Sequence, residues 1–138
     1  MKLNPYLSFP GTCETAFKFY EKLLGGKILA MMTPQGTPME QQMPPEQRNK
    51  IMHARMAVGD TVLMGSDCPP DRFDAMKGIT VCLSIDEPGE ADRVFKGLSE
   101  NASAITMPIQ ETFWARRFGM VTDQFGTPWM INCEKPMG

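Results

Sequence analysis

The chain has 138 residues, 42% of them hydrophobic, and a formal net charge of −2 from 14 basic and 16 acidic residues, which predicts a single domain. The balanced charge, with no basic run longer than Arg116–Arg117, argues against nucleic acid or an anionic membrane as a partner. No apolar stretch could span a bilayer, and Pro5 interrupts the start of the chain where a secretory leader needs a continuous apolar run, so we expect a cytoplasmic protein.

The first half of the chain predicts a strand, a helix and three further strands. The first strand covers residues 3–9, and the helix runs from about Thr12, which can cap it, to Leu24, with Gly25 and Gly26 ending it. A strand over 27–32 leads into a polar, Pro-rich stretch, 33–50, which is too long and broken to be regular. That stretch is either a mobile flap or an exchange arm in a dimer. The strand segments 52–59 and 61–67 then join through a two-residue turn, Gly59–Asp60.

The second half predicts the same order. A strand over 79–86 precedes a helix over 88–101, in which Ala91, Val94, Phe95 and Leu98 form an apolar stripe at helical spacing. A strand over 102–107, a loop that reaches Trp114, and a final hairpin follow. The hairpin strands cover 117–123 and 127–132, with the turn at 124–126. The chain is therefore expected to hold two βαβββ repeats, about 1–66 and about 79–133, joined by a linker at about 67–78.

Three long stretches carry a resemblance to a known family: NPYLSFPGTCETAFKFY at 4–20, HARMAVGDTVLMGSD at 53–67 and ETFWARRFGMVTDQFGTPWMIN at 111–132. With the repeated order, they resemble the vicinal oxygen chelate superfamily of glyoxalase I, bleomycin-resistance proteins and extradiol dioxygenases, and within it the PhnB-like branch. That branch has also been labelled demethylubiquinone methyltransferase-like. The first strand here, however, is followed by no glycine-rich loop that could hold a methyl-donor nucleotide.

The resemblance implies an α+β fold in which the two repeats form a curled mixed sheet, as half-barrels around a cavity, with the helices outside. It also implies a homodimer, often with the cavity assembled from both chains. In metal-bearing members four cavity-facing positions hold His or Glu ligands. The resemblance places these positions at Met64, Thr80, Met130 and, by two different counts from neighbouring residues, either Asn4 or Pro5. None of these side chains is a usual ligand of a divalent metal, so we expect no metal and no cofactor.

The remaining chemistry-bearing residues do not suggest a metal site either. The four cysteines are Cys13, Cys68, Cys82 and Cys133; they are scattered without CxxC spacing, which predicts buried free thiols. His53 is the single histidine. The cavity that the resemblance implies would be lined by Tyr6, Met64, Thr80, Cys82, Ser84 and Met130, which suits an apolar, even aromatic, small organic molecule.

Two polar features can orient a ligand or react with it. His53 and Arg55 alternate with apolar Ala54 and Met56, which places the two polar side chains toward the cavity. There His53 can act as a general acid or base and Arg55 can anchor an anionic group, or both can simply pair with acidic neighbours.

In the loop before the final hairpin, Trp114 with Arg116 and Arg117 can lid the pocket. Alternatively it is a structural loop or part of a dimer interface.

These observations lead to a metal-independent protein that binds a small organic molecule, with His53 as the candidate catalytic residue and Tyr6, Arg55, Met64, Thr80, Trp114, Arg117 and Met130 as candidate ligand-binding residues. One alternative is an enzyme of lyase, isomerase or dioxygenase type that uses His53 or an unrecognised metal site. Another is a dimeric scaffold whose pocket is filled by its own side chains.

Overall fold

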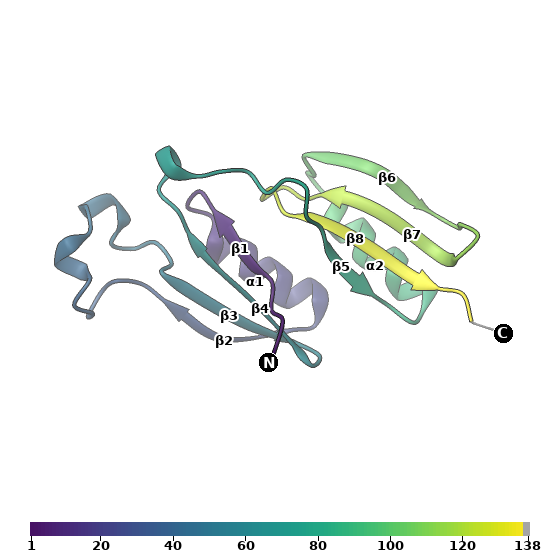
Figure 1. The fold of residues 1–138 in the computed structure, drawn as a ribbon, viewed down its shortest axis with the longest axis horizontal. Helices are drawn as coiled ribbons and strands as arrows, with labels where there is room; N and C mark the ends of the chain where they lie inside the picture. The colour runs from purple at the N-terminus through teal and green to yellow at the C-terminus, as the bar shows by residue number, and fades with distance from the viewer. Residues whose placement is uncertain (137–138) are drawn as a thin grey trace. The chain divides into compact units, whose positions relative to one another are not determined.

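The computed structural model describes residues 1–136, which divide into two compact units. Unit 1 comprises residues 1–74 and unit 2 begins at residue 75, inside the stretch expected as a linker. Each unit consists of a four-stranded mixed sheet and one helix, in the order strand, helix, strand, strand, strand (Figure 1). The predicted α+β class and the two βαβββ repeats are therefore confirmed. Among the helices of residues 1–136, none combines the length and apolarity needed to cross a membrane.

The sheet of unit 1 has the strand order β1-β4-β3-β2, with β1 and β4 parallel and the other pairs antiparallel. Its elements are β1 (Tyr6–Phe9), α1 (Cys13–Leu24), β2 (Lys27–Met32), β3 (His53–Val58) and β4 (Thr61–Asp67). The helix covers one face of this sheet (Figure 1). The buried side chains of α1 are Cys13, Ala16, Phe17 and Tyr20, and those of the strands are Leu7, Phe9, Ala54, Met56 and Leu63. Burial of these apolar groups is the main stabilising contribution of the unit.

The start of α1 differs from the expectation. Thr12 precedes the helix but its side chain makes no capping hydrogen bond. Instead, the Asp67 carboxylate at the end of β4 accepts hydrogen bonds from the backbone N–H of Cys13 (2.9 Å) and of Ile51 (2.8 Å). The Asp67 carboxylate thus supplies a hydrogen-bond acceptor to the N-terminus of α1 and links the helix to the end of β4. The C-terminal prediction is confirmed, because Gly25 ends the helix with φ of 68°.

The stretch between β2 and β3 contains two short 3₁₀ turns, Glu40–Gln42 and Pro45–Gln47. The Arg48 Nε–H donates to the main-chain carbonyls of Glu40 and Met43, at 3.1 and 3.2 Å. The segment therefore has local internal order, although it lacks long regular elements.

Unit 2 has the strand order β5-β8-β7-β6, and its β5 and β8 are parallel. Its elements are β5 (Val81–Ser84), α2 (Pro88–Ser99), β6 (Ala104–Gln110), β7 (Ala115–Thr122) and β8 (Pro128–Glu134). The predicted stripe of Ala91, Val94, Phe95 and Leu98 is the buried face of α2. Strand β6 is longer than expected, because it continues through Pro108, and its pairing with β7 is interrupted twice. Proline is tolerated there because β6 is an edge strand.

The turn between β7 and β8 is organised by a buried carboxylate. Asp123 is fully buried, and its Oδ1 accepts hydrogen bonds from the backbone N–H of Phe125 and Thr127, both at 2.9 Å. Its Oδ2 accepts from the Trp129 indole N–H at 2.8 Å. These bonds join the turn to the first residues of β8 and so fix the register in which Met130 and its neighbours pair.

The parallel pairs of the two units have the same register. Tyr6 lies opposite Met64 in unit 1, and Cys82 lies opposite Met130 in unit 2. Because side chains alternate along a strand, this correspondence assigns each position of one unit to a position of the other. The duplication inferred from the sequence is therefore present in the strand pairing itself.

Candidate functional site

Each sheet has a side that faces its helix and an opposite side, which we call the open face. In unit 1 the buried Leu7, Ala54, Met56 and Leu63 lie on the helix side. The alternate positions form the open face, and they are Tyr6, Ser8, His53, Arg55, Met64 and Ser66. The sequence prediction that His53 and Arg55 point away from the helix layer is thus confirmed.

His53 contacts an aromatic partner rather than an acidic one. Its ring stacks on Tyr6 with centroids 5.9 Å apart and an angle of 25° between the planes. The Tyr6 hydroxyl lies 3.3 Å from His53 Nδ1, a distance at which it can donate to a neutral ring. Within residues 1–136, His53 forms no ion pair with a carboxylate. The half-buried ring therefore lies on the open face with Tyr6, and not a carboxylate, as its partner among the described residues.

Arg55 lies on the same face as this pair and forms no ion pair within residues 1–136. It is exposed, with Met64 opposite it on β4 and Ala30 opposite it on β2. Among the residues that the structure describes, none forms a hydrogen bond or ion pair with the Arg55 guanidinium. The alternative that Arg55 pairs with acidic neighbours is therefore contradicted. An unpaired guanidinium above a thioether and a methyl group can hold a carboxylate or another oxyanion in a bidentate arrangement.

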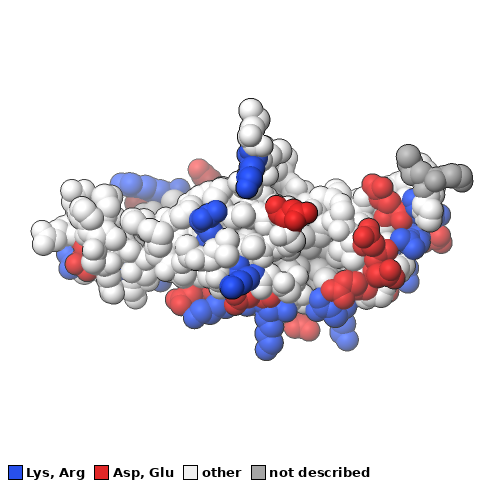
Figure 2. Space-filling view, turned by 90° about the horizontal axis from the view of Figure 1, so that it is seen from below, with Lys and Arg blue, Asp and Glu red and all other residues white. Residues whose placement is uncertain are grey.

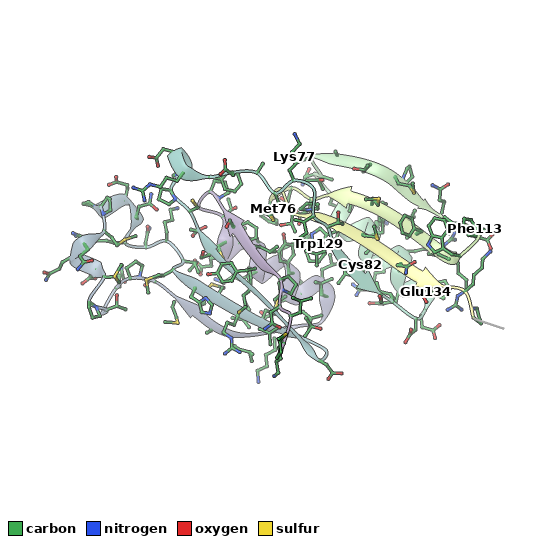
Figure 3. The ribbon with its side chains drawn as sticks, in the orientation of Figure 1. Met76, Lys77, Cys82, Phe113, Trp129 and Glu134 are labelled. Carbon is green, nitrogen blue, oxygen red and sulfur yellow. The ribbon has the colours of Figure 1, made fainter. Side chains whose placement is uncertain are left out.

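The open face of unit 2 carries different side chains. Its exposed or half-buried positions are Cys82, Ser84, Met120, Met130, Asn132 and Glu134, and the nearly buried Phe118 lies among them. Figure 3 labels Cys82 on β5 and Glu134 at the end of β8. Thr80 is half-buried and lies just before β5 rather than within it. This set has three sulfur-bearing side chains, Cys82, Met120 and Met130, whereas the set named for unit 1 has one, Met64.

The cysteine environments are not all those expected. Cys13 and Cys133 are buried free thiols, as predicted, but Cys68 is only half-buried and Cys82 is exposed. Burial of the sulfur raises the pKa of the Cys82 thiol above its ordinary value, and the Glu134 carboxylate raises it further, while a hydrogen bond with Ser84 acts against them. Cys82 is therefore a neutral thiol near pH 7 and a weak nucleophile.

The loop before β7 brings Trp114 to the open face but not Arg117. Trp114 packs edge-on against Phe118, with ring centroids 5.2 Å apart. Arg117 instead lies opposite Cys133 on the helix side, where its Nε is 3.0 Å from Asp92 Oδ1 of α2. Arg117 therefore does not lie on the open face, contrary to its expected place among the ligand-binding residues. The shift of register between Ala115 and Arg117 is the physical reason, because it changes which side chains of β7 share a face.

The first-strand position that holds a metal ligand in metal-bearing members was expected at either Asn4 or Pro5, and the strand pairing distinguishes between the two. Thr80 stands two residues before Cys82, the partner of Met130, and Asn4 stands two residues before Tyr6, the partner of Met64. Asn4 is therefore the counterpart of Thr80, and Pro5 is not. One amide, one hydroxyl and two thioethers do not suit a divalent zinc, nickel or iron ion. In residues 1–136, no three His, Cys, Asp or Glu side chains come together as a metal site.

Glu134 was missed by the sequence reading. The final strand was expected to end at Asn132, whereas β8 continues to Glu134. One further step of the alternation from Met130 and Asn132 would have indicated that Glu134 shares their face.

The charged groups of the molecule are mixed in sign, and Figure 2 shows acidic and basic side chains interspersed on the face that it draws.

Comparisons with known proteins give this arrangement a family. A model of the Glyoxalase/Bleomycin resistance protein/Dioxygenase superfamily matches residues 2–131. Protein YjdN of Escherichia coli (strain K12) is 37% identical over 146 residues, which cover 98% of this chain and 97% of YjdN. The crystal structure of protein PA1353 from Pseudomonas aeruginosa is similar at a TM-score of 0.88 with 42% identity and 99% of both chains covered.

A PhnB protein from Bacillus cereus shares the fold, with a TM-score of 0.81, 22% identity, and coverage of 96% of this chain and 99% of that one. The resemblance read from the sequence is confirmed by these matches. The chain belongs to the glyoxalase/bleomycin resistance protein/dioxygenase superfamily.

Proposed function

We propose that the protein binds a small organic molecule with an apolar or aromatic body and an anionic group, without the help of a metal. The observation that carries this proposal is the unpaired guanidinium of Arg55 on the open face of unit 1. A guanidinium that forms no ion pair within residues 1–136 can bind a carboxylate on a ligand. The mismatch of Asn4, Thr80, Met64 and Met130 with metal-ligand chemistry supports the metal-independent part.

The surroundings of Arg55 determine what else the ligand should carry. Met64 provides an apolar surface beside the guanidinium, and the Tyr6–His53 stack provides aromatic surface in the adjacent position. The hydroxyls of Ser8 and Ser66 lie opposite one another in the neighbouring row and can add hydrogen bonds. An aryl carboxylate matches this combination of cation, thioether and stacked rings.

The experiment uses benzoate as the anionic probe and benzyl alcohol as its neutral counterpart. Protein labelled with ¹³C at the methionine methyl groups reports binding through the Met64 signal in NMR titrations. Benzoate should bind more tightly than the alcohol, and Arg55→Met should weaken benzoate binding at least about tenfold, because a charge-assisted hydrogen bond is lost. The matched control is Arg72→Met, which removes an exposed guanidinium from the same unit. Equal binding of the two probes, or equal losses in the two variants, would contradict the proposal.

A second candidate function is acid–base catalysis by His53. The observation in its favour is that the ring contacts the Tyr6 hydroxyl and, within residues 1–136, forms no ion pair with a carboxylate, which leaves it accessible to a bound molecule as a general acid or base. Phenylpyruvate, an enolisable anion, tests this in D₂O. The protein should accelerate exchange of the α-protons, observed by ¹H NMR, and His53→Gln should remove the acceleration. Identical exchange rates with both proteins would leave only the binding function.

We also propose that the protein is a cytoplasmic homodimer. Exposed apolar side chains support association, among them Leu3 (99% exposed) and Ile79 (71%). The four free cysteines are consistent with a reducing compartment.

A further inference from the structure

An aromatic cluster stands at one end of the open face of unit 2. Trp114 packs edge-on against both Phe113 and Phe118, with ring centroids 4.8 and 5.2 Å away. Phe113 is 89% exposed and Trp114 is 42% exposed, whereas Phe118 is only 8% exposed. Figure 3 labels Phe113 in the loop between β6 and β7. The cluster thus has a buried base in the sheet and two rings that water can reach, an arrangement that leaves aromatic surface for a ligand.

The polar groups next to this cluster are Asn132 and Glu134, whose acceptor oxygens are only partly satisfied within residues 1–136. Asn132 lies opposite Phe118, and its Nδ2 is 3.3 Å from Glu134 Oε1. Because only the amide nitrogen can donate to a carboxylate, this contact turns the Asn132 Oδ1 to the other side. That oxygen is buried and has no hydrogen-bond partner in the described part of the chain. A buried acceptor of this kind is costly unless a donor meets it.

The nearby cations do not neutralise Glu134. Arg116 donates to the main-chain carbonyls of Glu134 (3.2 Å) and Asp86 (2.7 Å) rather than to a carboxylate. Lys135 forms an ion pair with Glu111 at 3.2 Å. Within residues 1–136, the Glu134 carboxylate has the neutral amide of Asn132 as its partner and forms no ion pair. At this end of the face the Glu134 carboxylate therefore lacks a paired cation among residues 1–136, and the Asn132 Oδ1 lacks a donor there.

We propose that this end of unit 2 binds a small organic cation, an ammonium group carried on an apolar body, through the faces of Trp114 and Phe113 and the carboxylate of Glu134. Aromatic faces attract cations, and tryptophan does so most strongly. A carboxylate without a counter-charge adds direct attraction, and the unsatisfied Asn132 oxygen beside it is a further acceptor for the N–H of a primary or secondary ammonium.

This site is different from the one proposed in unit 1. By the shared register, the counterparts of His53 and Arg55 in unit 2 are Phe118 and Met120. Unit 2 therefore has an aromatic ring and a thioether where unit 1 has its two basic side chains. The proposal concerns unit 2 alone and stands or falls independently of anion binding by Arg55.

Benzyltrimethylammonium chloride is the probe, and benzyl alcohol and sodium chloride are its neutral and ionic controls. The ¹³C-methyl signals of Met120 and Met130 report binding in unit 2, and the Met64 signal reports unit 1. The cation should shift the signals of unit 2 and bind at least about tenfold more tightly than benzyl alcohol, because attraction to the aromatic faces and to the carboxylate requires its charge.

Two variants test the residues. Glu134→Gln keeps the size and the hydrogen-bonding capacity of the side chain and should weaken cation binding at least about tenfold. Trp114→Phe keeps an aromatic ring against Phe118 and should weaken it about threefold. The matched control is Glu100→Gln, which removes an exposed carboxylate next to α2, and Arg55→Met should also have no effect.

Equal binding of the alcohol and the ammonium probe would overturn the proposal, as would a Glu134→Gln variant that binds the cation normally. Shifts that appear equally with sodium chloride would do the same. The methyl spectrum of each variant without probe shows whether it is folded, so a structural loss cannot be mistaken for a binding loss. If Glu134→Gln is unfolded, Glu134→Ala takes its place, and normal cation binding by that folded variant, which has no carboxylate, would equally count against the site.

Discussion

The four thiols of the chain differ in what surrounds them. The pKa of Cys13 is raised to about 12, first by burial and then by the carboxylates of Asp67 and Glu14, which repel a thiolate. The exposed Cys82 has a raised pKa as well, first because its sulfur is partly desolvated. Neither thiol is ionised near neutral pH, so exposure and not acidity decides which of them reacts first.

Alkylation by iodoacetamide should follow this order. In the folded protein Cys82 should react first, and its rate should keep rising above pH 9, because its thiolate forms only at a pH above the ordinary value of 9.0. Cys13 and Cys133 should stay unmodified until the protein is unfolded. Peptide mass spectrometry after timed labelling between pH 7 and pH 10 measures all four rates. In urea the four should react alike, and native labelling of Cys13 as fast as that of Cys82 would refute the assignment.

Residue positions on the open faces could be predicted where a strand is regular. The alternation of Ala54 and Met56 with His53 and Arg55 was sufficient to predict which side chains face away from the helix, because β3 pairs with β4 without interruption. The same reasoning failed for Arg117, since β7 contains a register shift that no local residue pattern announces. It could not be predicted either that Arg55 has no ionic partner within residues 1–136, because its neighbours lie on strands far apart in the sequence.

At the scale of elements, each helix packs on its sheet through a glycine. A Cβ at Gly65 of β4 would lie 2.9 Å from the Leu7 carbonyl oxygen and 2.9 Å from the Phe17 ring of α1. A Cβ at Gly119 of β7 would lie 2.7 Å from the Phe95 ring of α2. The glycines therefore allow an aromatic ring of the helix to lie directly against the strand backbone.

Gly65→Ala should lower the free energy of unfolding by about 1–3 kcal/mol, since the new methyl group overlaps a backbone oxygen that cannot move easily. The matched control is Gly89→Ala in α2, where a Cβ would meet nothing within 4 Å. That change should be neutral or stabilise by up to about 1 kcal/mol, because alanine favours helix. Urea denaturation followed by circular dichroism gives both values. A Gly65→Ala protein as stable as the parent would show that the helix can shift at little cost.

The boundaries of the elements were predictable to different degrees. Both helices were visible in the sequence because their buried residues recur at helical spacing and Gly25 ends the first. The cap of α1 was not, because its acceptor, Asp67, is 54 residues away from Cys13. The end of β8 was expected at Asn132, two residues before its actual end at Glu134, because a charged residue is not typical of a strand interior.

At the scale of the whole molecule, the two units present unpaired groups of opposite charge. Arg55 in unit 1 and Glu134 in unit 2 each lie on an open face without an ionic partner among residues 1–136. The duplicated fold is therefore used for two different kinds of surface. A ligand that carries one sign of charge should distinguish between them.

Native mass spectrometry of the purified protein, combined with plasma-emission analysis for metals, tests the proposals at this scale. The main species should have twice the mass of the chain, and a copurified organic molecule would account for any additional mass. Zinc, nickel, manganese and iron should be present far below one ion per chain, because the side chains at the expected ligand positions are of the wrong type. A monomer across the concentration range would refute the dimer, and a stoichiometric metal would refute metal-independent binding.

The shared register of Tyr6–Met64 and Cys82–Met130 has a consequence for how such a chain can evolve. Substitutions on an open face change the chemistry of that face without entering the core, while the helix side keeps each unit folded. After a duplication, the two copies could therefore acquire different side chains at equivalent positions. Arg55 of unit 1 and Met120 of unit 2 are such a pair. New specificities can arise in this scaffold one unit at a time, while the other unit retains the older one.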